Sequence, residues 1–80
     1  MDDEEIIKKI NALANEEHEL YNKEAHGVTT PEERERLRAL EVALDQCWDL
    51  LHQRRARRRA GLNPDEATIR DENTVEGYLG

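Results

Sequence analysis

The fold of this chain is decided by residues 37–51, which read LRALEVALDQCWDLL. Apolar residues recur in this stretch at spacings of three and four, at Leu37, Leu40, Leu44, Cys47 and Leu51. This spacing is the a/d seam of a heptad repeat, which packs one stripe of an α-helix against a partner helix. Ala43 and Leu50 flank the seam on one side and Trp48 on the other. The pattern predicts a helix whose apolar face is wider than one helix–helix contact needs.

The ends of this helix have clear signals in the sequence. Thr30 is a good N-cap, Pro31 suits the first helical position, and Glu33 can complete a capping box. Gly61 provides a left-handed stop at the other end. We therefore expect a helix over residues 31–60.

A second helix is predicted before it, over residues 3–25. Its apolar residues lie three, four or seven apart, at Ile6, Ile10, Leu13 and Leu20. The short turn at residues 26–30 favours an antiparallel pair of helices. In that register Leu20 faces Leu37, Leu13 faces Leu44, and Ile6 faces Leu51. The predicted fold is all-α, an antiparallel two-helix hairpin over residues 1–60.

The last part of the chain, residues 61–80, is predicted to be an extended or partly disordered tail. Pro64 and scattered polar residues oppose a long helix, although one helical turn after Pro64 is compatible with them. Its apolar residues could dock on the helices or stay free, and both alternatives are open: Leu62, Ile69, Val75, Tyr78 and Leu79.

Two helices provide only a thin core, so we expect two hairpins to pack as a homodimeric four-helix bundle. The flanks of the seam supply the candidate interface residues, which are Tyr21, Ala43, Trp48 and Leu50. Trp48 is the strongest of them, because tryptophan is enriched at binding hot spots.

A run of arginines ends the second helix, and its members are candidates for charged contacts: Arg54, Arg55, Arg57, Arg58 and Arg59. The hairpin brings them beside the acids of residues 2–5, so intramolecular pairing is the first interpretation. Arginines also bind phosphate, which makes nucleic acid an alternative partner. The net charge of −7 opposes this alternative.

Composition excludes several classes of protein. The chain has 80 residues, of which 39% are charged, and no apolar run approaches the ~20 residues that span a bilayer. The acidic residues 2–5 are unlike the basic start of a signal peptide. A single cysteine cannot form an internal disulfide, and we expect a cytoplasmic protein that does not bind membranes.

Candidate chemistry is weak in this sequence. Cys47 lies on the core seam and is expected to be a small buried hydrophobe rather than a nucleophile. His18 and His52 fall far apart in the hairpin, and neither belongs to the Glu-x-x-His pattern of metal-binding bundles. Glu17 and Glu24 are expected to pair with Arg34 and Arg38 across the hairpin. We expect no cofactor, no metal and no catalytic residue.

The segment 45–51, together with Glu16-Glu17-His18 and the ending at residues 75–79, resembles a family of small actinobacterial proteins known as domain of unknown function 2630. The resemblance covers nearly the whole chain and implies a cytoplasmic bacterial protein of this length. It implies no activity. The first hypothesis is a non-enzymatic, homodimeric helical module that binds another protein. The alternatives are a regulator that contacts nucleic acid or a nucleoprotein and, more remotely, a metal-binding bundle.

Overall fold

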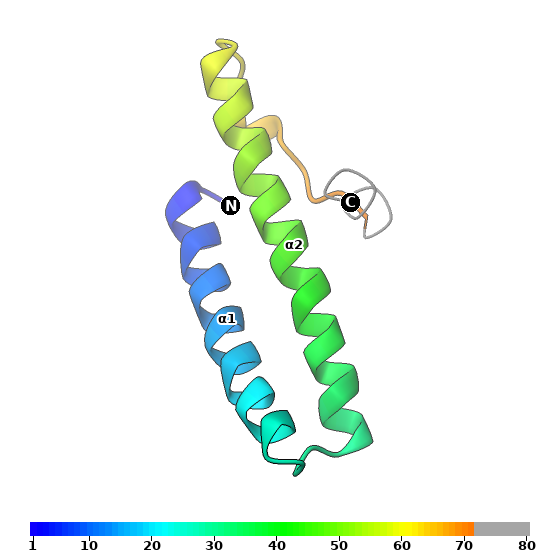
Figure 1. Ribbon diagram of the computed structural model, residues 1–80. Coiled ribbons are helices and arrows are strands. Elements are labelled where there is room, and N and C mark those ends of the chain that lie inside the picture. The colour runs from blue at the N-terminus through cyan, green and yellow to red at the C-terminus, as the bar shows by residue number, and fades with distance from the viewer. Residues whose placement is uncertain (72–80) are drawn as a thin grey trace.

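The computed structural model describes residues 1–71 and is an all-α antiparallel hairpin (Figure 1). Helix α1 spans Asp3–Ala25, helix α2 spans Pro31–Arg59, and a single 3-10 turn, η1, spans Pro64–Glu66. The predicted fold class is therefore confirmed, and the helical turn after Pro64 is present. Helix α2 projects beyond the first residues of α1, so the end that carries the arginines has no helix beside its tip.

Local capping sets the start of both helices. The carboxylate of Asp2 accepts a hydrogen bond from the backbone N–H of Glu5 at 2.8 Å. Thr30 caps α2 in the same way, with its hydroxyl accepting from Glu33 N–H at 3.1 Å. In both boxes the glutamate reaches back to the N-cap N–H, so each box satisfies two backbone donors at the start of its helix.

Two glycines end the helices in the left-handed conformation. Gly27 has φ of 70° after α1, and Gly61 has φ of 75° after α2. Side chains make this conformation unfavourable, so glycine lets the chain reverse directly after the last helical turn. The stop predicted at Gly61 is confirmed.

The core consists of two clusters along the contact between the helices. Near the turn, one cluster joins Leu20 to Leu37 and Leu40. Farther along, the second cluster contains Ile6, Ile10, Leu44, Cys47, Leu50 and Leu51. Leu13 packs against both clusters and connects them. This arrangement agrees with the register predicted from the heptad spacing.

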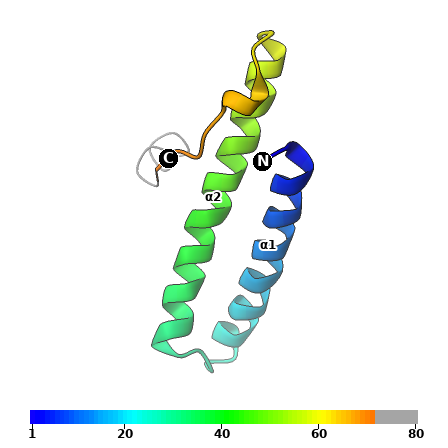
Figure 2. The ribbon, with the colours of Figure 1, turned by 180° about the vertical axis from the view of Figure 1, so that it is seen from behind.

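The described part of the tail, residues 62–71, lies along α2. Both views of the ribbon place α2 between α1 and this segment (Figures 1 and 2). Gln53 donates its amide to the carbonyl of Thr68 at 2.8 Å, and Gln46 donates to the carbonyl of Arg70 at 3.2 Å. Of the predicted tail, residues 61–80, the described part therefore docks on α2. Val75, Tyr78 and Leu79 lie outside the described residues.

Replacing Leu51 by alanine should unfold much of the population. Leu51 is 1% exposed and belongs to the larger cluster, so the truncation removes about 3 kcal/mol of unfolding free energy. Urea unfolding followed by circular dichroism measures the loss. Val28→Ala is the matched control, because Val28 is 62% exposed in the turn. A Leu51→Ala variant as stable as Val28→Ala would contradict this description of the core.

Candidate interaction surfaces

Helical geometry divides the arginine run into two groups. Arg54, Arg57 and Arg58 form ion pairs with carboxylates of α1 or the tail. Arg55 and Arg59 are exposed and form no ion pair with any residue in the range 1–71. The expected pairing with the acidic start of the chain is thus present, but it uses only part of the run.

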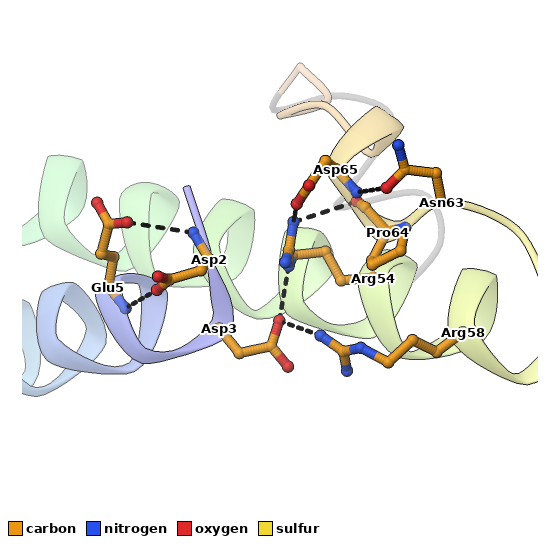
Figure 3. A network of polar contacts seen from close by, with 8 residues as sticks. All are labelled: Asp2, Asp3, Glu5, Arg54, Arg58, Asn63, Pro64 and Asp65. Carbon is orange, nitrogen blue, oxygen red and sulfur yellow. Dashed lines mark hydrogen bonds and ion pairs between the residues drawn. The ribbon is translucent and has the colours of Figure 1, made fainter.

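Arg54 is the buried member of the run, with 5% of its surface exposed. Figure 3 shows its polar contacts. Its Nε donates to Oδ1 of Asp3 at 2.6 Å. Its Nη1 donates to the carbonyl of Pro64 at 3.2 Å and to Oδ1 of Asp65 at 3.0 Å. One guanidinium therefore connects the first turn of α1, the last turns of α2 and the η1 turn. We refer to these residues, together with Arg58, as the Arg54 cluster.

The carboxylate of Asp3 in this cluster is held in its ionised form. Arg58 donates from Nη2 to the same Asp3 oxygen at 2.6 Å. The hydrogen bonds from Arg58 and then Arg54 lower the pKa of Asp3 from 3.8 to about 2. The carboxylate of Asp3 is therefore charged at neutral pH.

A second buried charge, Asp49, was not identified as an ion-pair partner from the sequence. It is 4% exposed and accepts hydrogen bonds from Gln53 at 2.9 Å and from Nε of Arg70 at 2.8 Å. The bonds from Arg70, then those from Gln53, lower the pKa of Asp49 against the effect of burial. One signal existed: Arg70 is the single basic residue among the five acids of the tail. This pair, with Arg57 and Glu66 at 3.4 Å, fixes the tail on α2.

The tail changes the environment of one predicted interface residue. Leu50 is 5% exposed and lies in the larger core cluster, against which Ala67 of the tail also packs. Leu50, one of the predicted interface candidates, is therefore already buried within a single hairpin. The heptad pattern places Leu50 on a flank of α2, but the docked tail covers that flank.

Ala43 lies on the same side of α2 as the tail. It lines a shallow open groove of about 340 Å³ with Ala39, Val42 and Gln46, between Glu35 and Arg38. Ala43 is five positions from Trp48, which is about 140° around the helix. These two candidates therefore cannot contribute to the same patch on α2.

Tyr21 and Trp48 do share a side of the hairpin. The hydroxyl of Tyr21 donates to the carboxylate of Glu41, and this bond is the first cause that raises the pKa of Tyr21 to about 12. Residues seven apart follow one line along a helix. Ile7, Ala14 and Tyr21 form such a line on α1, and Glu41, Trp48 and Arg55 form one on α2. The Tyr21–Glu41 bond joins the lines, and we call the surface they form the Trp48 face.

Large apolar side chains are exposed on the Trp48 face. Ile7 is 41% exposed, Trp48 43% and Tyr21 45%. The imidazole of His52 lies beside the indole of Trp48, with 6.3 Å between ring centroids. Exposed aromatic side chains such as Trp48 and Tyr21, at the edge of the hydrophobic core, are typical of a protein–protein contact surface.

The charge pairs across the hairpin differ from those expected for Glu17 and Glu24. Arg36 pairs with Glu16 at 2.8 Å, and Lys23 pairs with Glu33 at 2.8 Å. Arg34 donates instead to the hydroxyl of Thr29 at 3.4 Å. Glu16 and Lys23, the sequence neighbours of Glu17 and Glu24, are therefore the residues of α1 that pair with α2.

The thiol of Cys47 lies in the hydrophobic core. Cys47 is 4% exposed, and burial raises the pKa of its thiol. Among residues 1–71, no group of three or more histidine, cysteine or acidic side chains is placed to hold a metal ion. Over the same residues, no helix combines the length and apolarity needed to cross a bilayer.

Comparison with known proteins extends over almost the whole chain. The family model described as protein of unknown function (DUF2630) matches residues 2–80. Uncharacterised proteins of Mycobacterium bovis and Mycobacterium tuberculosis are 47% identical to this chain over 79 residues. The match covers 98% of this chain and 91% of each relative. No solved structure matches.

Replacing Arg54 by methionine should destabilise the fold while keeping the aliphatic packing. Asp3 and Asp65 lose a partner but stay partly exposed, so the expected loss is about 2 kcal/mol, below the cost for a fully buried pair. Urea unfolding measures it. Arg55→Met is the matched control, because exposed substitutions change stability by less than about 0.5 kcal/mol. Equal stability of the two variants would refute the role of the Arg54 cluster.

Acid should weaken the Arg54 cluster within a defined pH range. The folded pKa of Asp3, about 2, lies below its ordinary value of 3.8. The stabilisation from its carboxylate is therefore complete above about pH 4 and is lost as pH falls to about 2. The thermal midpoint of Asp3→Asn should fall less over this range than that of the unmodified protein. Glu19→Gln, at an exposed position, should follow the unmodified protein; coincident curves for all three proteins would contradict the assignment.

Proposed function

We propose that this chain, which belongs to the DUF2630 family of proteins of unknown function, is a non-enzymatic helical interaction module. It acts as a homodimer in the cytoplasm, and the paired hairpins form a four-helix bundle that binds another protein. The proposal rests on one observation above all: the large apolar side chains of Ile7, Trp48 and Tyr21 are exposed along the same side of the hairpin, the Trp48 face.

The rest of the molecule supports this choice of surface. On the other side of α2, the tail covers Leu50 and occupies Asp49, Gln53 and Arg54. The Trp48 face has no such cover among residues 1–71. Two helices with one seam bury little apolar area, so a second copy that covers Trp48 adds stability as well as contact.

Nucleic-acid binding would need free arginines, and catalysis would need an accessible nucleophile. The surroundings of these side chains favour the interaction module instead. Arg54, Arg57 and Arg58 already bind carboxylates, which leaves Arg55 and Arg59 for an external anion. Two arginines in a chain of net charge −7 make a weak site for nucleic acid. Arg55 and Arg59 suit an acidic protein surface beside the bundle better. Burial of Cys47 leaves its thiol poorly placed as a nucleophile, and an unpaired thiol fits the reducing cytoplasm.

Replacing Trp48 by alanine should convert the dimer into a monomer. The expected mass in light scattering falls from twice the chain mass towards 9.3 kDa, because the variant loses the largest apolar contact. Ile69→Ala is the matched control, since Ile69 is 53% exposed on the tail and should leave the mass unchanged. An unmodified protein that is monomeric at every concentration would refute the homodimer.

Retention on heparin or RNA separates the proposal from nucleic-acid binding. An interaction module of this charge should pass through both columns at physiological salt. Strong retention that decreases steeply with salt, and is lost on replacing Arg55 and Arg59 by glutamine, would favour the alternative.

A further inference from the structure

We infer that the Trp48 face binds a second copy of this chain with the two α2 helices antiparallel, crossing at Trp48. Glu41 of each copy then pairs with Arg55 of the other. This inference rests on the proposed homodimer and specifies its geometry. The observation behind it is the order of residues along one line of α2.

That line carries one acid and one base at equal distances from the tryptophan. Glu41 precedes Trp48 by seven residues, and Arg55 follows it by seven. Seven residues advance about 10.5 Å along a helix and return to nearly the same side. All three side chains are exposed in the hairpin, and Arg55 has no ion-pair partner among residues 1–71.

A twofold axis at Trp48 makes this line complementary to itself. With the helices antiparallel, each position before Trp48 faces the position equally far after Trp48 in the other copy. Glu41 then meets Arg55 twice, and the two indoles meet at the axis. With the helices parallel, Glu41 faces Glu41 and Arg55 faces Arg55, so like charges repel at both positions. Charge therefore selects the antiparallel arrangement.

The same twofold axis also lets the α1 helices of the two copies pack against each other. Cys47 and Ile10 belong to one core cluster, so Trp48 lies near the level of Ile10 along the hairpin. An axis at this level brings Ile7 of one copy towards Ala14 of the other, because these positions lie on either side of Ile10. A large side chain then meets a small one, which suits close packing of α1 against its copy.

Charge reversal tests the geometry directly. In Glu41→Arg or Arg55→Glu, both cross-pairs of the homodimer become repulsive. Each variant should dimerise at least about tenfold more weakly than the unmodified protein in sedimentation equilibrium. The double variant Glu41→Arg/Arg55→Glu restores both pairs with reversed polarity and should regain the unmodified affinity. Circular dichroism verifies that each variant folds. Glu19→Arg is the matched control, because Glu19 is exposed on α1 outside the Trp48 face, and it should dimerise normally.

Mixing the two single variants gives an independent readout. Glu41→Arg and Arg55→Glu place complementary charges at both contacts, so a mixture should form heterodimers that neither variant forms alone. Single variants that dimerise as tightly as the unmodified protein would overturn the antiparallel geometry, as would a double variant as weak as the singles. If Trp48→Ala still gives monomers in that case, the homodimer stands and only its geometry fails. If the unmodified protein is monomeric, both fail.

Discussion

The buried guanidinium of Arg54 is the constraint on which the described structure depends. Burying a charge is costly unless partners compensate it, and Arg54 finds those partners in separate segments of the chain. Asp3 comes from the start of α1, and Asp65 and the carbonyl of Pro64 come from η1. A slip of the helices by one turn would separate Asp3 from Arg54, and a tail in another direction would remove Asp65. Apolar contacts tolerate such slips better, because leucines recur along both helices. The charge contacts therefore select one register and one tail path among several apolar packings.

Features set by local chemistry could be predicted from the sequence, and features set by distant partners could not. Thr30, Pro31 and Glu33 define the start of α2 among neighbours, and Gly61 ends it by its own backbone freedom. The heptad spacing fixes which leucines meet. The burial of Leu50 and Asp49 has no such periodic signal, because it depends on Ala67 and Arg70. Within the hairpin, periodicity identifies the correct faces but not which neighbours pair. Arg36 accordingly binds Glu16, whereas the predicted pairs join Glu17 and Glu24 to Arg34 and Arg38.

The docked tail makes the two sides of α2 different. On one side, residues 62–71 supply Arg70 to Asp49 and backbone carbonyls to Gln46 and Gln53, so this side resembles a small domain interior. On the other side, Trp48 and Tyr21 remain exposed, with the indole of Trp48 beside His52 and the hydroxyl of Tyr21 bonded to Glu41. Among residues 1–71, the tail thus docks on one side of α2, while Ile7, Trp48 and Tyr21 stay exposed on the Trp48 face, the surface that we propose for a partner. This asymmetry explains why Ala43 and Trp48, which the heptad pattern places on opposite flanks of the seam, have different surroundings.

The arginine run combines two roles because an α-helix turns by about 100° per residue. Arg54 and Arg58 are four apart and both point to Asp3, while Arg57 points to Glu66. Arg55 lies between them in sequence but returns to the line of Trp48, seven residues earlier. A compact stretch of like charge can therefore hold the hairpin closed and still present a cation beside an apolar contact. This division also accounts for the position of Glu41. An acid on the line of Trp48 bonds Tyr21 of α1 within one chain, and in the homodimer that we propose the same acid pairs with Arg55 of the second copy.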